Sequence, residues 1–337
     1  MPSRDLIVVG ASAGGVEALR AFVGGLPDGL AAAVAVVLHM PAGGTSALPA
    51  ILRRSGPLPV VGAKHGMPLR TGRIHVAPPD HHLIVTDGAV RLSRRPTENG
   101  HRPSVDALFR SAAVARGPSV IGVVLSGTLD DGAAGMVAIT SRGGLAVVQD
   151  PEDALYSGMP AAVLRNLHVE HVLPAAEMGV LLREVAGRPV ADAGEPSDLL
   201  RKETALSADE AGAPRGEVSR MGTPSTFSCP DCHGTLTSLD ADHTRFRCHV
   251  GHAWTAEALL EAQDTALERA LWTALRTLEE KATLARRMGR AARARGSRPL
   301  VERYRATEVE ASSAAEVLRS HLLSGAFVRH AHPEPDA

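Results

Sequence analysis

A serine, a histidine and a pair of aspartates each follow an apolar, strand-like segment of this sequence. Ser12 lies in the motif Gly10-Ala11-Ser12-Ala13-Gly14-Gly15, directly after Leu6–Val9, and His39 directly follows Ala33–Leu38. If these segments are neighbouring parallel strands, both side chains lie at the carboxyl edge of one sheet. A serine hydroxyl beside an imidazole is the minimum arrangement of an activated nucleophile, so the pair predicts covalent hydrolytic chemistry.

A third apolar segment, Val120–Leu125, is followed by Asp130 and Asp131, either of which could orient the histidine. An aspartate before Gly-Ala-Ala is also a good helix N-cap, so capping alone could explain it. Spacing does not choose between the two aspartates. The chain order Ser…His…Asp argues against the α/β-hydrolase fold but not against a triad, because a triad is defined by geometry.

The glycine-rich motif at residues 10–15 has three other interpretations. It could be a tight turn whose glycines only permit close packing. A dinucleotide-binding turn would require an acid at the end of the next strand, where His39 stands. A phosphate-binding P-loop would require a following Gly-Lys-Ser/Thr, which is missing. The fourth interpretation is a nucleophile turn, which needs a nearby histidine, and His39 is the same residue that argues against dinucleotide binding. The backbone N–H that follows Ser12 could then stabilise an oxyanion.

Short apolar segments alternate with amphipathic ones over residues 5–186, which predicts a doubly wound, mostly parallel α/β sheet. Thr86-Asp87-Gly88-Ala89 predicts a β-hairpin inserted in it. Strands are expected at Leu6–Val9, Ala33–Leu38, Leu58–Val61, Ile74–Ala77, Leu83–Thr86, Val90–Ser93, Val120–Leu125, Leu145–Gln149 and His168–Val172. Helices are expected at Val16–Gly25, Ser46–Arg54, Ser104–Ala115, Ala133–Arg142, Pro160–Arg165 and Ala175–Val185.

The charge balance excludes some partners. The 337 residues carry 36 Lys+Arg against 37 Asp+Glu, a formal net charge of -1, so neither nucleic acid nor an anionic membrane is the expected partner. No apolar run approaches the roughly 20 residues that span a bilayer, and the first residues carry no signal-peptide pattern. We therefore expect a soluble cytoplasmic protein without membrane insertion.

All three cysteines fall close together, in Cys229-Pro-Asp-Cys232 and in Cys248-His-Val-Gly-His252. Two such knuckles are typical of a zinc ribbon, so residues 226–254 are predicted to be a small module with structural Zn²⁺ held by these four residues. Three neighbouring histidines are weaker candidates for the fourth ligand: His233, His243 and His249. Three reduced cysteines without metal are the alternative.

The chain is expected to consist of an α/β domain (residues 1–187), a flexible linker (188–225), the zinc-ribbon-like module, a helical hairpin (255–325) and a disordered tail (326–337). Ala, Gly, Pro and acidic residues without periodicity suggest the linker. Leucines and alanines spaced three and four apart from Leu267 suggest the hairpin, a possible homodimer contact.

Residues 5–186 resemble the CheB-type protein-glutamate methylesterase catalytic domain of bacterial chemotaxis. The stretches that carry the resemblance are Gly10-Ala11-Ser12-Ala13-Gly14-Gly15, Leu38-His39-Met40, Ala77-Pro78-Pro79-Asp80-His81-His82-Leu83, Arg102-Pro103-Ser104-Val105-Asp106-Ala107-Leu108-Phe109, Leu125-Ser126-Gly127, Asp131-Gly132-Ala133-Ala134-Gly135-Met136, Gln149-Asp150 and Gly158-Met159-Pro160. These motifs occur in the family's order over slightly more than half of the chain.

The resemblance implies roles for individual residues. Ser12 would be the nucleophile, His39 the general base and Asp131 the residue that orients it, with the backbone N–H groups of Ala13 and Thr128 as the oxyanion hole. The reaction implied is hydrolysis of glutamate methyl esters on the cytoplasmic region of methylated chemoreceptors, with glutamine deamidation as a secondary activity. No catalytic cofactor is implied.

Two departures from the family pattern affect what to expect. Ala13 stands where the family often has Thr, and Thr128-Leu129-Asp130 stands where it usually has Met-Gly-Asn, so Leu129 restricts φ where the family has glycine. With the nucleophile motif starting at residue 10, control by a receiver domain ahead of it is not expected, so we expect the catalytic domain to be either ungated or controlled by the C-terminal segment. The alternative function is a weakly active or inactive signalling adaptor that binds partners through this segment.

Overall fold

The computed structural model of the chain describes residues 2–208 and 218–324. It divides the chain into two compact units, one reaching Leu259 and the other beginning at Leu260. The first unit holds the predicted α/β domain and the cysteine-containing segment, and the second holds most of the C-terminal helices.

The first unit is built on a seven-stranded sheet of order β3-β4-β2-β1-β7-β8-β9, in which every pair of neighbours is parallel. Its strands are β1 (Leu6–Ala11), β2 (Ala33–Leu38), β3 (Val60–Gly62), β4 (Ile74–Val76), β7 (Val120–Val124), β8 (Leu145–Gln149) and β9 (His171–Leu173). β1, β2 and β7 are the central strands, and all of their residues are buried. The doubly wound parallel sheet is therefore as predicted.

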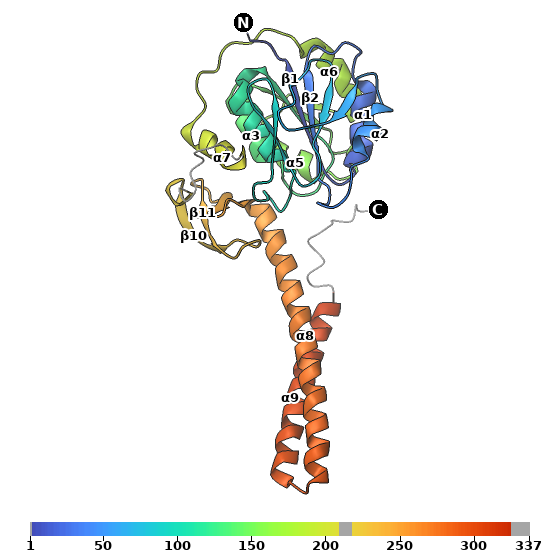
Figure 1. Cartoon of the computed structure of the whole chain (residues 1–337), viewed down its shortest axis with the longest axis vertical. Helices are drawn as coiled ribbons and strands as arrows, with labels where there is room; N and C mark the ends of the chain where they lie inside the picture. The colour runs from blue at the N-terminus through green and yellow to red at the C-terminus, as the bar shows by residue number, and fades with distance from the viewer. Residues whose placement is uncertain (1, 209–217, 325–337) are drawn as a thin grey trace. The chain divides into compact units, whose positions relative to one another are not determined.

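Helices cover both faces of this sheet because successive side chains of its apolar strands point to opposite faces. In β1, Ile7 and Val9 pack with one set of helices, whereas Leu6 and Val8 pack with the other. The first set is α1 (Gly15–Gly25), α2 (Leu48–Arg53) and α6 (Met178–Val185), and the second is α3 (Val105–Arg116), α4 (Ala133–Ser141) and α5 (Gly158–Asn166). Figure 1 shows α1 and α3 on opposite sides of β1 and β2.

The predicted hairpin is present as a separate two-stranded antiparallel sheet, β5 (His82–Val85) and β6 (Val90–Ser93). It packs against α3, and the Thr86 N–H closes its turn on the Ala89 carbonyl at 2.9 Å. This hairpin leads the chain to residues 97–104, which enter α3 from the side of the sheet where β1, β2 and β7 end.

The structure corrects the prediction of a flexible linker over residues 188–225. Helix α7 (Asp198–Ala208) lies within this range and packs against α3, β5 and β6, burying Leu200 and Leu206. Composition did not reveal this helix because one of its inward side chains is Glu203, whose charge is compensated by Arg245 from a distant part of the chain. Residues 209–217 lie outside the described part of the chain.

A four-stranded antiparallel sheet follows, of order β10-β11-β12-β13. Its strands are β10 (Thr223–Ser228), β11 (Thr235–Ser238), β12 (Arg245–Cys248) and β13 (Ala253–Thr255). We call residues 218–259, which contain this sheet and the first turn of α8, the C-terminal module. Its sheet begins three residues before the predicted boundary at 226 and packs as part of the first compact unit.

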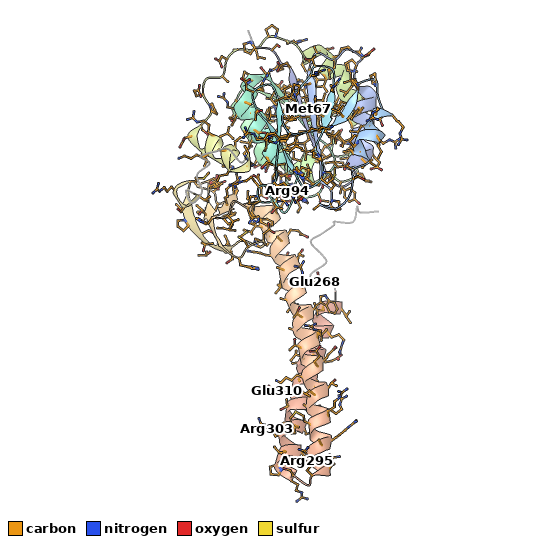
Figure 2. The ribbon with its side chains drawn as sticks, viewed as in Figure 1. Met67, Arg94, Glu268, Arg295, Arg303 and Glu310 are labelled. Carbon is orange, nitrogen blue, oxygen red and sulfur yellow. The ribbon has the colours of Figure 1, made fainter. Side chains whose placement is uncertain are left out.

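The second unit contains the predicted helical hairpin, made by α8 (Ala256–Ala294) and α9 (Arg298–Leu323). Gly296, at φ 73°, lies in the break between them, and Arg286 Nε of α8 bonds Glu308 Oε1 of α9 at 2.7 Å. Arg319 pairs with Glu279 further from the break, so the helices are antiparallel. Figure 2 labels Arg295 at this turn.

The structure does not test two predictions about the C-terminal end of the chain. A homodimer through α8 and α9 stays a prediction. The predicted disordered tail at 326–337 lies outside the described residues. Among the residues that are described, no helix is long and apolar enough to cross a bilayer.

Candidate active site

Ser12 lies in the sharp connection between β1 and α1. Its N–H donates to the Ser126 carbonyl at 2.9 Å, which ties the connection to the loop after β7. Gly14, at φ 67°, takes the left-handed conformation that turns the chain into α1, and Gly15 begins the helix. Side chains are excluded nearby, because a Cβ on Gly127 would lie 2.9 Å from the Ser12 Cβ and 2.0 Å from the Met159 sulfur. The turn therefore presents the serine at the carboxyl edge of the sheet.

His39 stands beside Ser12 because β2 and β1 are parallel and in register, with Leu38 opposite Ala11. The His39 N–H donates to the Ala11 carbonyl at 3.1 Å and continues the ladder by one residue. The imidazole Nδ1 lies 3.0 Å from Ser12 Oγ, and Nε2 lies 2.7 Å from Asp131 Oδ2. An N–H on Nε2 donating to the carboxylate leaves Nδ1 as the acceptor for the serine hydroxyl.

Asp131 is buried at the N-terminus of α3, where free backbone N–H groups favour an anion. It accepts hydrogen bonds from the N–H groups of Val105 at 2.8 Å and Asp106 at 3.1 Å, and from the Ser104 hydroxyl at 3.1 Å. Burial opposes ionisation of Asp131, but the bond from His39 and these donors hold its pKa well below the usual range. Asp131 is thus a carboxylate poised to orient His39.

The structure separates the two aspartates that spacing could not distinguish. Asp131 reaches His39, whereas Asp130 Oδ1 accepts a hydrogen bond of 2.7 Å from the Thr255 hydroxyl of the C-terminal module. Burial raises the pKa of Asp130 to about 7. Asp131 is therefore the carboxylate in position to act with the histidine, and Asp130 contacts a different part of the chain.

The two backbone N–H groups of the predicted oxyanion hole are not used by the other parts of the protein that the structure describes. In the described part of the chain, the N–H groups of Ala13 and Thr128 donate to no other protein group. Leu129 has φ 59°, so a bulky side chain occupies the left-handed conformation that the sequence predicted to be restricted. The loop thus has the conformation that glycine would adopt without strain, and leucine in this conformation costs about 1 kcal/mol.

Two residues that sequence reasoning missed complete this site. The imidazole of His101 stacks on that of His39, with ring centroids 3.7 Å apart and an angle of 16° between the planes. Burial and the neighbouring His39 lower the pKa of His101 to about 4. Asn99 Nδ2 donates to Asp131 Oδ1 at 3.3 Å. The dipeptide Asn99-Gly100, with φ values of 53° and 75°, is a turn signal that could have indicated a specialised loop.

An open cavity of about 420 Å³ adjoins His39. One wall comes from the segment after β2 and the other from the loop that carries His101. The residues that line it are His39, Met40, Pro41, Ala42, Asp80, Thr97, Gly100, His101 and Arg102. The cavity is thus lined by His39, whose imidazole contacts Ser12, and by His101, which stacks on it.

The other charged residues of this region are held by structural contacts. His82 is fully buried and bonds the Pro96 carbonyl at 3.0 Å, and burial lowers its pKa. Arg94 and Arg102 both pair with Asp80, although the Arg94 side chain remains 66% exposed.

The three cysteines and His252 come together in the C-terminal module. Their ligand atoms all lie within 4.8 Å of one another, with Cys232 Sγ 3.6 Å from Cys248 Sγ and Cys248 Sγ 3.5 Å from His252 Nδ1. A tetrahedral ion bonded to sulfur at about 2.3 Å and to nitrogen at about 2.0 Å separates its ligand atoms by about 3.6–3.8 Å. Two of the separations thus match those of a tetrahedral site, and the four predicted ligands form a cluster that could bind a metal ion.

A serine hydroxyl, a histidine imidazole and a buried carboxylate contact one another in that order at the carboxyl edge of a parallel sheet. This arrangement defines the serine-hydrolase class of site. The family model for CheB methylesterase matches residues 7–182, just over half of the chain, and the chain belongs to this family. The expected resemblance is thereby confirmed, and the match ends before the C-terminal module.

Named relatives and a solved structure agree with this assignment. The chain is 45% identical over 190 residues to a protein-glutamate methylesterase/protein-glutamine glutaminase of Nocardioides sp., covering 55% of this chain and 52% of the relative. It is 41% identical over 181 residues to one of Anaeromyxobacter dehalogenans, covering 54% and 53%. The chain thus spans about half the length of these curated relatives.

The crystal structure of the Thermotoga maritima CheB methylesterase catalytic domain superimposes with a TM-score of 0.52 at 32% sequence identity. The superposition covers 54% of this chain and 98% of that domain.

Proposed function

We propose that this chain is a protein-glutamate methylesterase, which hydrolyses γ-glutamyl methyl esters on the cytoplasmic region of methylated chemoreceptors. The observation that carries the proposal is the line of contacts Ser12–His39–Asp131, with 3.0 and 2.7 Å between the polar atoms, inside a domain of the CheB methylesterase family. The names of the relatives, which include protein-glutamine glutaminase, support glutamine deamidation as a second activity of the same site.

In the first half of the reaction, the Ser12 oxygen attacks the ester carbonyl carbon and its proton passes to His39 Nδ1. The carbonyl oxygen becomes an oxyanion, for which the free N–H groups of Ala13 and Thr128 are the proposed donors. His39 is then an imidazolium between Ser12 and the Asp131 carboxylate. The C–O bond to the methoxy group breaks, and His39 returns the proton to give methanol.

In the second half, water attacks the acyl carbon attached to Ser12 while His39 Nδ1 takes one of its protons. The ester bond to Ser12 breaks, the proton returns to the serine oxygen, and the product is the glutamate carboxylate. Asp131 keeps the same orientation throughout, since its oxygens are held by the backbone at the start of α3. With a glutamine side chain the leaving group is ammonia instead of methanol.

For the cysteine cluster we propose structural Zn²⁺ bound by Cys229, Cys232, Cys248 and His252. Three thiolates and one imidazole are a ligand set that zinc prefers, and four protein ligands leave no open position for substrate. Asp231 Oδ2 lies 3.6 Å from His252 Nε2, so a carboxylate is placed to orient the imidazole that would bind the ion through Nδ1. A metal in this cluster would stabilise the module and take no part in ester hydrolysis.

The test of the proposed function is methanol release from a methylated chemoreceptor cytoplasmic fragment, comparing the chain with its Ser12→Ala variant. We expect release by the unmodified chain and a loss of about 10⁴-fold or more in the variant, with an unchanged unfolding midpoint. Equal release by both proteins would contradict the role of Ser12. Release by neither, with folding confirmed, would favour the signalling adaptor.

A further inference from the structure

The C-terminal module contacts the active-site loop through β13, the edge strand of its sheet. The Asn99 N–H donates to the Ala253 carbonyl at 2.8 Å, and the Ala253 N–H donates to the Thr97 carbonyl at 3.3 Å. Glu98 and Ala253 form a parallel bridge. Residues 97–99 therefore extend the module's sheet, although they belong to the loop that supplies Asn99 and His101 to the site.

Thr255, at the end of β13, forms hydrogen bonds with Asn99 and with Asp130. Asn99 is a hydrogen-bond partner of the Asp131 carboxylate, and Asp130 is its neighbour in the chain. Its N–H donates to Asn99 Oδ1 at 2.8 Å, which leaves the Asn99 amide N–H₂ directed at Asp131. Its hydroxyl donates to Asp130 Oδ1 at 2.7 Å. Since Asp130 is adjacent to Asp131 in the chain, one threonine restrains the carboxylate through the backbone on one side and through a side-chain amide on the other.

The proposed metal cluster lies at the other end of this same strand. His252 directly precedes β13, and the Cys248 N–H donates to the His252 carbonyl at 3.0 Å. Asp231, which faces His252 Nε2, also accepts a hydrogen bond of 2.6 Å from the Thr97 hydroxyl on the wall of the substrate cavity. The ligand His252 and the adjoining Asp231, which precedes the ligand Cys232, are thus both connected to the contact with the loop.

Buried charges hold the module against the α/β domain. Glu98 is 1% exposed and pairs with Arg110 of α3 and with Arg247 of β12, the latter at 3.1 Å. Burial opposes ionisation of Glu98, but the two guanidinium groups hold its pKa far below the usual range. Separating the module would remove Arg247 from the buried Glu98 and leave Arg110 as its one remaining guanidinium partner of this pair, so the contact is kept as long as the module is folded.

We propose that the C-terminal module is a structural part of the active site, in which Thr255 positions the Asp130–Asp131 loop and metal bound by the cysteine cluster fixes Thr255. Thr255 and Asn99 are positioning residues that act through Asp131 and touch no substrate. The proposal rests on the proposed roles of Ser12, His39 and Asp131. Because the family match ends at residue 182, this dependence is a property of this chain that the family assignment does not include.

The test measures how fast Ser12 reacts with a fluorophosphonate, followed by intact-mass spectrometry of the full chain. The Ser12 oxygen forms a bond to phosphorus, the P–F bond breaks with loss of fluoride, and the serine proton passes to His39. We expect Thr255→Val to lower the maximal rate of labelling about tenfold, with the half-saturating probe concentration unchanged. Thr255→Ser, which keeps the hydroxyl, should restore the rate to within about twofold.

A matched pair at Asp130 separates this effect from helix capping, because the Thr255 hydroxyl also accepts the Ala258 N–H at the start of α8. Asp130→Ala and Asp130→Asn remove the same charge, but only asparagine can still accept from Thr255. Labelling should be about tenfold slower in the alanine variant than in the asparagine variant. Equal rates in this pair, or a serine variant at 255 as slow as the valine variant, would overturn the proposal. Thr273→Val, on the exposed part of α8, is the control for the substitution itself.

The metal arm uses hydrogen–deuterium exchange, which does not depend on catalysis. Removal of metal by 1,10-phenanthroline should accelerate exchange in residues 97–106 at least tenfold, and addition of ZnCl₂ should reverse it. A peptide covering Ala33–Leu38 should stay slow, since it belongs to the central sheet. Unchanged exchange at 97–106 after verified metal loss would overturn the proposal. If Ser12 in the unmodified chain does not react at all, the nucleophile assignment fails and this arm decides the coupling alone.

Discussion

The parallel sheet and the C-terminal module meet at the same site but are held together by different forces. In the sheet, the central strands are wholly apolar and buried, and two hydrophobic clusters fill the space beneath the helices. The module is a small four-stranded sheet whose interior is rich in sulfur and charge, with Cys229, Cys248 and Arg247 buried. A segment of this size cannot bury enough apolar area to be stable alone, so cross-links must contribute.

Because of this difference, the residues Ser12, His39 and Asp131 are held in position by two kinds of interaction. Ser12 and His39 stand on strand ends whose positions follow from hydrophobic burial, which changes little with pH, metal or salt. The Asp131 loop is supported by α3 on one side and, through Asn99 and Asp130, by a module that depends on ion pairs and on the cysteine cluster. Changes aimed at either kind of support should therefore have distinguishable consequences.

The largest effect is expected from a cavity in the sheet region. Phe22 of α1 is fully buried in the cluster beneath β1 and β2, so Phe22→Ala should lower the free energy of unfolding by about 4 kcal/mol in urea denaturation. Phe227 in the module is 44% exposed, and Phe227→Ala should cost about 1 kcal/mol or less. Similar costs for the two variants would mean that the Phe227 side chain contributes as much to stability as a fully buried phenylalanine of the sheet region.

The next effect comes from the charges between the two regions. Glu98→Gln should destabilise the chain by about 3 kcal/mol, because Arg110 and Arg247 would remain buried with a neutral partner. The exposed pair Glu279–Arg319 is the matched control, and Glu279→Gln should cost no more than about 0.5 kcal/mol. Denaturation midpoints at low and high salt measure both, and an equally small cost at Glu98 would refute the importance of the buried pairs.

A smaller, pH-dependent effect is expected at Asp130. Burial raises its pKa from the ordinary value of 3.8 to about 7, so the folded chain keeps a proton that the unfolded chain releases above about pH 4. The stability from this group is therefore fully present below pH 4 and is lost as the pH rises towards 7. Asp130→Asn imitates the protonated form, so it should be about 1–2 kcal/mol more stable than the unmodified chain at pH 8.

Below about pH 4, where Asp130 is protonated in both the folded and the unfolded chain, the two proteins should have nearly the same melting temperature. A difference that is the same at both pH values would show that Asp130 titrates like an exposed aspartate. The Thr255 hydroxyl lowers the pKa of Asp130 and so limits the size of the effect.

The smallest effect is expected from relief of backbone strain. Leu129→Gly should stabilise the chain by about 0.5 kcal/mol, because the cost of a left-handed leucine slightly exceeds the entropy that glycine adds to the unfolded state. Urea denaturation measures the change, and turnover should stay within about twofold of the original. A loss of stability would mean that contacts of the Leu129 side chain outweigh the strain.

Much of the fold and of the site could be predicted because the signals are local. The strands before Ser12 and His39 are continuous apolar segments, and parallel neighbours necessarily bring their carboxyl ends together. The cysteine spacing likewise indicated the cluster that the structure assembles. Helix α7 was missed because its buried Glu203 is compensated by a residue some forty positions later, a pairing that composition cannot reveal.

By itself, the sequence determined the doubly wound sheet, the serine and histidine at its edge and the grouping of the three cysteines with His252, because periodicity, strand ends and cysteine spacing are short-range properties. Spacing left Asp130 and Asp131 open, and only the family resemblance favoured Asp131. The tertiary structure alone decided that His101 stacks on His39 and that Asn99 and Thr255 connect Asp131 to the C-terminal module. These contacts join residues up to 156 positions apart. Their geometry depends on how β13 packs against the loop at residues 97–99, and no local pattern encodes such packing.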